Sequence, residues 1–205
     1  EKYNLNLEAK SPIAIPDVGR NDLAELLCDL GYKVGVEVGV FRGVYSEVLC
    51  KANPELMLYS IDPWTPYPTY RDFRKKSVLD DAHAMAAELL SPYNCEIIEK
   101  TSMEAVEAFE DESIDFVYID ANHELRHVTD DIVEWSKKVR PGGVVSGHDY
   151  IKSKSIGSKN HVVHAVNAYA AAYGIRPWFL FGAKNRTKGE GEIRDKQRSW
   201  MWVKA

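Results

Sequence analysis

Two kinds of apolar pattern alternate along most of this chain. Short, nearly continuous apolar runs bounded by glycine or polar residues are typical of strands buried on both faces of a parallel sheet. Between them lie longer segments whose apolar residues recur at helical spacing. Strands are therefore predicted at residues 34–40, 56–61, 95–98, 114–119 and from 144 onward. Helices are predicted at residues 21–30, after residue 43, and at 72–90, 102–109, 125–139 and 161–173.

Helices that alternate with strands in this way cover both faces of a parallel sheet. Two aromatic strands near residues 177–182 and 199–203 close the chain with no helix between them, which predicts an antiparallel hairpin over residues 175–205. The sequence thus predicts a doubly wound α/β fold, whose mostly parallel seven-stranded sheet has its last strand antiparallel. We expect a single domain over residues 1–205, with residues 1–20 as an irregular N-terminal lead-in.

Composition and charge narrow the class of protein. The chain has 205 residues, of which 45% are apolar and 28% charged, as expected of one globular domain. A net charge of −5 disfavours general binding to nucleic acid, which depends on neutralising phosphates. No apolar run is long enough to cross a membrane, and no signal segment opens the chain. Three scattered cysteines indicate reduced thiols. We expect a cytoplasmic protein that binds neither nucleic acid nor membrane.

The predicted strands carry polar residues at their carboxyl ends, which is where ligands bind in sheets of this kind. The first strand ends in VEVGVFRG, with Glu37 and Gly39, and the second ends at Asp62, which is suited to accept hydrogen bonds from a ribose diol. The glycines of the first motif stand four apart, so the GxG pair of a pyrophosphate-binding dinucleotide loop is missing. The acid at Glu37 suits a cationic amino group better than a phosphate.

Acidic and imidazole side chains follow the next two strands of the predicted parallel sheet. Asp120 and His123 follow one strand, and His148 and Asp149 follow the other. Neighbouring strands lie about 4.8 Å apart, so these groups can converge. In one interpretation Asp120, His148 and Asp149 bind a divalent cation, where oxygen ligands suit Mg²⁺ and an imidazole ligand suits Mn²⁺ better. In the other there is no metal, and His123 or His148 is the general base.

Four motifs together resemble a known family. GVEVGVFRG, SIDPW, FVYIDANH and RPGGVVSGHDY are similar to motifs of the class I S-adenosylmethionine-dependent methyltransferases. Within that class they most resemble the small-molecule O-methyltransferases, which include catechol-type and macrolide-sugar enzymes. The resemblance covers about residues 30–150 and the terminal hairpin, and it implies a Rossmann-like sheet.

The resemblance also implies roles for individual residues. Glu37 and Gly39 would lie by the methionine part of the cofactor, Asp62 would hold the ribose hydroxyls, and Ser102 and Met103 would flank the adenine. The implied cofactor-binding residues are Glu37, Gly39, Asp62, Trp64, Ser102, Met103 and Asp120.

The resemblance also implies a place for Asp120, and the position of Trp64 in the chain suggests one for that residue. Asp120 would end its strand beside the sulfonium, and Trp64 would cover the cofactor at the start of a substrate lid over residues 63–73. The candidate catalytic residues are Asp120, His123 and His148. The catechol-type enzymes carry an Asp-Asn pair where this chain has His148-Asp149, so the choice between Mg²⁺ and Mn²⁺ stays open.

The function that the resemblance implies is methyl transfer from S-adenosylmethionine to an oxygen of a small polar acceptor, with assistance by a divalent cation left open. One alternative is a metal-independent methyltransferase with a histidine base. From other classes, an NAD-binding oxidoreductase and a catalytically silent cofactor-binding module stay open. Aromatic residues near 173–181 leave a homodimer contact open as well.

Overall fold

The computed structural model describes residues 2–15, 18–66, 75–151, 160–182 and 197–205. Its strands are β1 (Ile13–Ile15), β2 (Val34–Val38), β3 (Met57–Ile61), β4 (Cys95–Ile98), β5 (Ile114–Ile119), β6 (Val139–Gly147), β7 (Trp178–Phe181) and β8 (Ser199–Val203). Its helices are α1 (Arg20–Asp29), α2 (Val44–Ala52), α3 (Lys76–Leu90), α4 (Ser102–Ala105), the 3₁₀ turn η1 (Val106–Ala108), α5 (Leu125–Lys138) and α6 (Val162–Ala172).

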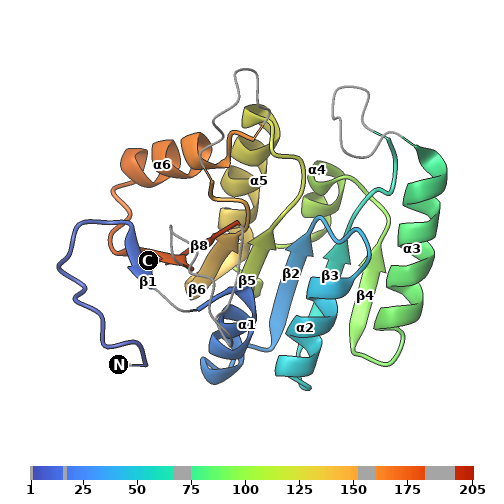
Figure 1. Cartoon of the computed structure of the whole chain (residues 1–205), viewed down its shortest axis with the longest axis horizontal. Coiled ribbons are helices and arrows are strands. Elements are labelled where there is room, and N and C mark those ends of the chain that lie inside the picture. Colours follow the sequence, from blue (N-terminus) through green and yellow to red (C-terminus); the bar gives the residue numbers. More distant parts are fainter. Residues whose placement is uncertain (1, 16–17, 67–74, 152–159, 183–196) are drawn as a thin grey trace, which may run out of the picture.

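The strands form one sheet in the order β1-β7-β8-β6-β5-β2-β3-β4 (Figure 1). Strand β8 runs antiparallel to both β6 and β7, and the other pairings are parallel. The prediction of a doubly wound, mostly parallel sheet with one antiparallel strand near the C-terminus is confirmed. The predicted count of seven is wrong, because the described residues form eight strands.

The additional strand is β1, which lies within the segment expected to be irregular. It pairs with β7 at the edge of the sheet, where Ile13 lies opposite Phe179. Only three residues long, with two of them buried, β1 is too short to give a periodic signal in the sequence.

Strand β6 begins earlier than predicted. The Pro141-Gly142-Gly143 sequence indicates a break before a strand at Val144, yet β6 starts at Val139. The register against β5 shifts there, because Val139 lies opposite Ile114 and Val144 lies opposite Phe116. The extra residues therefore form a bulge, which accommodates the proline and glycines inside the strand.

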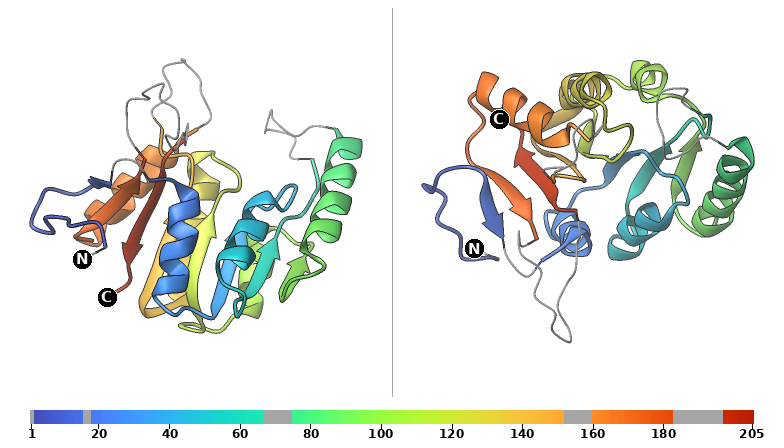
Figure 2. Two further views of the ribbon diagram at one scale, coloured as in Figure 1. Left: turned by 60° about the horizontal axis from the view of Figure 1, so that its bottom comes forward. Right: turned by 45° about the horizontal axis from the view of Figure 1, so that its top comes forward.

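Both faces of the sheet are covered, which explains the nearly continuous apolar runs of its strands (Figure 2). Side chains of β5 alternate between the faces: Phe116 and Tyr118 pack with α1 and α2, whereas Val117 and Ile119 pack with α5 and α6. A third cluster joins α3 to the segment after β3 and includes Trp64. No helix in the described part of the chain is long and apolar enough to cross a membrane.

The order of the strands places the ligand crevice. Successive strands run from β2 through β3 to β4 on one side, and β5 then returns to the other side of β2. In open α/β sheets, ligands bind beyond the carboxyl ends of the strands at such a reversal. The crevice therefore lies beyond the ends of β2 and β5.

Candidate functional site

A cavity of about 400 Å³ lies at this reversal, between the carboxyl ends of β2, β3 and β5 and the first turns of α4 and α5. Its volume falls within the range of small-molecule sites. Among the residues that line it are five of those predicted to bind the cofactor: Gly39, Asp62, Ser102, Met103 and Asp120.

Gly39 allows the end of β2 to pack directly against the segment that follows β5. Its φ is +94°, and a β-carbon there would lie 2.2 Å from the carbonyl oxygen of Asp120. The amide of Gly39 donates to the carbonyl of Ile61 at 2.8 Å, and the amide of Asp120 donates to the carbonyl of Val38 at 2.8 Å. The glycine thus allows the segment after β2 to pack directly against the segment after β5. A residue with a side chain does not fit at this position.

Asp62 lines the cavity and also holds the loop around it. Its Oδ2 accepts the amides of Val40 at 3.1 Å and Phe41 at 2.9 Å, and its Oδ1 accepts the amide of Trp64 at 2.8 Å. Burial raises the pKa of Asp62, and these backbone hydrogen bonds oppose that rise only in part. A carboxylate offers about four acceptor positions, so about one remains for a ligand hydroxyl.

Two residues of this loop have unusual backbone conformations. Phe41 has a φ of +50° and Trp64 a φ of +41°, which is rare for bulky side chains. The hydrogen bonds to Asp62 and a bond from the Trp64 indole to the Phe41 carbonyl, at 2.8 Å, hold both residues in place. Strain of this kind persists only where the surroundings over-determine it.

Trp64 is buried beneath the loop. Its side chain is 1% exposed and stacks on His83 with 4.4 Å between the ring centroids. Pro63 and Thr65 line the cavity, whereas Trp64 is not among the described residues that do so. Most of the expected lid at residues 63–73 lies outside the described residues, which end at Pro66 and resume at Lys75.

Glu37 is buried behind the cavity wall. It is 2% exposed, accepts a hydrogen bond from the hydroxyl of Ser46, and is not among the cavity-lining residues of the described chain. Ser60 in turn donates to Ser46 at 3.0 Å. Burial raises the pKa of Glu37 to about 8, and the Ser46 hydrogen bond only partly offsets this effect. Its contact with the methionine part of a cofactor stays a prediction.

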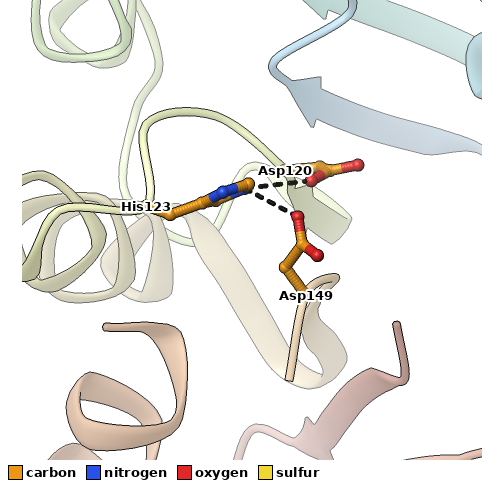
Figure 3. Close-up of side chains that lie close together, drawn as sticks. All are labelled: Asp120, His123 and Asp149. Atoms are coloured by element: carbon orange, nitrogen blue, oxygen red, sulfur yellow. Dashed lines mark hydrogen bonds and ion pairs between the residues drawn. The ribbon is translucent and has the colours of Figure 1, made fainter. Parts of the chain in front are cut away.

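Asp120, which lines the cavity, lies close to His123 and Asp149, and the three side chains point toward one another (Figure 3). The Nε2 atom of His123 lies 3.4 Å from Oδ1 of Asp120 and 3.0 Å from Oδ2 of Asp149. Burial lowers the pKa of His123, but hydrogen bonds to the two carboxylates outweigh it and raise the pKa to about 10. The imidazole of His123 is therefore protonated at neutral pH in this structure.

The same three side chains fit a divalent cation. One ligand atom from each lies within 4.8 Å of the others. Two carboxylate oxygens and one imidazole nitrogen suit Mg²⁺ or Mn²⁺. The predicted metal ligands were Asp120, His148 and Asp149, so this cluster contains His123 in the place of His148.

His148 borders the cluster. It is 8% exposed, and its Nδ1 lies 3.5 Å from Oδ2 of Asp120. Asp149 follows with a φ of +56°, a conformation that aspartate tolerates better than most residues and that directs its carboxylate toward His123 (Figure 3). Burial acts to raise the pKa of Asp149, but the hydrogen bond from His123 holds it below its usual range.

Sequence reasoning missed Asp131, a buried acid in the cavity wall. Asp131 lies on α5, is 3% exposed and accepts a hydrogen bond from the Ser102 hydroxyl at 2.5 Å. Burial raises its pKa to about 7. Its position in the sequence could have indicated that it faces inward. Asp131 stands three residues after Val128 and four before Trp135, so it lies on the apolar face of the helix.

Comparisons with known proteins agree with this architecture. A family model described as a methyltransferase domain matches residues 36–150. A search of curated proteins found no match. TomG from Streptomyces achromogenes, an O-methyltransferase of tomaymycin synthesis solved with SAM, is 18% identical, with 97% of this chain and 82% of TomG covered and a TM-score of 0.62. An O-methyltransferase from Bacillus cereus solved with SAH is 15% identical, with 98% and 85% covered and a TM-score of 0.61. At these identities the solved structures show a shared fold.

Proposed function

This chain belongs to the methyltransferase family whose domain model spans residues 36–150, and on that premise we propose that it methylates an oxygen of a small polar acceptor. It is an S-adenosylmethionine-dependent methyltransferase of class I. The observation that carries the proposal is the cavity at the reversal of strand order, where Gly39, Asp62, Ser102, Met103 and Asp120 meet although they come from four separate segments of the chain.

The cavity suits S-adenosylmethionine in shape and chemistry. When bound, this cofactor supplies a methyl group made electrophilic by its sulfonium. Asp62 has about one acceptor position left, which suits a ribose hydroxyl. Asp120 belongs to the triad and lines the cavity. Its carboxylate would attract the positive sulfonium of the cofactor. The fold shared with TomG and with the Bacillus cereus protein, which were solved with SAM and SAH, supports this choice.

Asp120 links the cofactor cavity to the candidate catalytic end, because it belongs both to the cavity wall and to the triad. Methyl transfer requires the acceptor oxygen to be aligned with the methyl group and to lose its proton. The carboxylates of Asp120 and Asp149 can orient an acceptor hydroxyl by accepting its hydrogen bond. His123 holds a proton between them, so it must lose that proton before it can act as a base.

A divalent cation is an optional part of this proposal. Asp120, His123 and Asp149 would hold it, with His148 beside them, and it would lower the pKa of an acceptor hydroxyl as a Lewis acid. The metal-independent alternative assigns the base to His123 or His148. The spacing of the triad supports the metal, because one ligand atom from each of its three side chains lies within 4.8 Å of the others.

Methyl transfer is tested by measuring release of S-adenosylhomocysteine from S-adenosylmethionine with a catechol, a hydroxylated sugar and a hydroxy acid as acceptors. We expect release with a hydroxyl acceptor and at least a hundredfold loss in Asp120→Asn. Glu112→Gln is the matched control, since Glu112 lies at the other end of β5 and bonds only surface partners among the described residues. Release that needs an amine or thiol acceptor and excludes hydroxyls contradicts the proposal.

A further inference from the structure

We propose that Asp131 binds the exocyclic amino group of the cofactor's adenine, with Ser102 and Trp135 as positioning residues. The inference rests on the proposed function, because it requires an adenosine group in the cavity. The resemblance implies that Ser102 and Met103, which follow β4, flank the adenine, and this inference adds a residue of α5.

The hydroxyl of Ser102 is already committed within the protein. A hydroxyl has one hydrogen to donate, and that of Ser102 goes to Oδ1 of Asp131 at 2.5 Å. The same oxygen accepts the indole N–H of Trp135 at 2.8 Å. Ser102 therefore has no donor left for a nucleobase, although it lines the cavity.

Asp131, in contrast to Ser102, offers a ligand an oxygen that no described residue uses. Its side chain lines the cavity at only 3% exposure, and its Oδ2 accepts no hydrogen bond from any residue in the described ranges. Because Asp131 lines the cavity, a carboxylate oxygen without a donor from the described residues is available to accept a hydrogen bond from a ligand. Burial, together with the neighbouring charge of Asp130, raises the pKa of Asp131 to about 7, and the hydrogen bond from Ser102 only partly opposes this rise.

The apolar residues that line the cavity indicate which kind of hydrogen-bond donor a ligand would bring to Asp131. Val38, Ile61 and Met103 line the same cavity with apolar side chains, which suits a flat heteroaromatic ring better than a free ammonium group. Adenine presents such a ring with an N–H donor at its edge. The amino-acid end of the cofactor carries its ammonium toward Gly39, by the placement that the resemblance implies.

The carboxylate is also held rigidly. Trp135 lies one helical turn after Asp131, is fully buried, and packs edge-on against Phe109 with 5.2 Å between ring centroids. The indole fixes Ser102, and Ser102 fixes Asp131. An acceptor that needs no rearrangement binds its ligand with less entropic cost and discriminates better.

The test compares S-adenosylhomocysteine with S-inosylhomocysteine, in which a carbonyl oxygen replaces the 6-amino group, by calorimetry at pH 8. We expect the wild-type protein to bind the adenosyl ligand at least tenfold more tightly. In Asp131→Asn the side-chain amide can donate to the carbonyl, so the preference falls below about threefold or inverts. Asp130→Asn is the matched control and keeps the wild-type preference, because Asp130 also lines the cavity but does not bond Ser102.

The outcomes separate this inference from the proposed function. Binding of S-adenosylhomocysteine with the same preference in wild type and Asp131→Asn overturns the assignment of Asp131 and leaves the cofactor intact. Failure of the wild type to bind either ligand overturns both. The wild-type comparison needs no variant, so equal affinities for the two ligands overturn the assignment even if Asp131→Asn does not fold.

Discussion

Gly39 and Asp120 pack so closely that a β-carbon on Gly39 would lie 2.2 Å from the carbonyl oxygen of Asp120. The two residues end neighbouring parallel strands, and they line the same cavity. This contact joins the loop that follows β2 to Asp120, the first residue of the triad. The position of Asp120 therefore depends on the absence of a side chain on the adjacent strand.

Replacing Gly39 by alanine tests this contact. We expect Gly39→Ala to lower the free energy of unfolding by roughly 2–4 kcal/mol, from backbone strain and overpacking together, and to abolish cofactor binding. Gly174→Ala is the control, because Gly174 also has positive φ but has open space around it, and it should cost only about 1 kcal/mol. Urea unfolding measures the free energy of unfolding of both variants. Equal effects of the two substitutions would contradict the close contact.

Asp62 combines a structural and a binding role. In Asp62→Asn the loop amides of Val40, Phe41 and Trp64 lose a charged acceptor, so we expect the Kd for S-adenosylhomocysteine to rise at least tenfold. Asp115 also accepts backbone amides, from Lys33 and Val34, at the opposite end of the sheet.

Asp115→Asn is thus a matched control for lost stability. It should lower the unfolding free energy by about 1–3 kcal/mol and leave the Kd within twofold. If both variants bind the ligand as tightly as the wild type, Asp62 has no role at the cofactor.

Glu37 should make stability depend on pH. Its pKa of about 8 in the folded protein lies above that of the unfolded chain, so the folded state holds the proton more tightly. The resulting stabilisation is lost as pH rises from about 4.5 through 8. Glu37→Gln removes this dependence, and the variant should gain stability relative to wild type over that range in thermal melts.

The same variant tests whether Glu37 contacts the cofactor. Since Glu37 is not among the described residues that line the cavity, we expect Glu37→Gln to change the Kd for S-adenosylhomocysteine by less than about threefold. A loss of tenfold or more would instead support the direct contact that the resemblance implies.

Metal binding at the triad should compete with a proton. His123 has a pKa of about 10, and a metal ligand must give up its proton, so Mn²⁺ affinity should rise about tenfold for each pH unit between 7 and 9. We expect Asp149→Ala to weaken Mn²⁺ binding at least tenfold in calorimetry. Asp111→Ala should leave it unchanged, because Asp111 is an exposed acid that precedes β5, whereas Asp120 follows that strand. Mn²⁺ affinity that does not vary with pH would exclude His123 as a ligand.

The sequence predicted most of the fold because the sheet is buried on both faces. Strand β5, for example, therefore appears as an apolar run whose bounds match the prediction. The sequence did not predict edge strand β1, because two buried isoleucines are too few to form a periodic pattern. It also did not predict the start of β6, because Pro141 and the two glycines after it indicate a break between elements. Both errors arise where tertiary pairing overrides local signals.

At the candidate site, the sequence predicted which residues follow each strand but not the directions of their side chains. His123 and His148 both follow strands, and only the turn at Asp149 places His123 between two carboxylates. Asp131 was missed because a helical period shows that it faces inward and says nothing of the cavity there. Such contacts depend on loop conformation, which residue spacing does not specify.

The central claim is that this cavity binds S-adenosylmethionine, and the most direct test is calorimetric titration of chelator-treated protein with S-adenosylhomocysteine. We predict binding at one site per chain with a micromolar Kd, and an affinity at least tenfold lower in Asp62→Asn. Absence of binding by the wild-type protein, together with binding of NAD to the same sample, would contradict the account and favour an oxidoreductase.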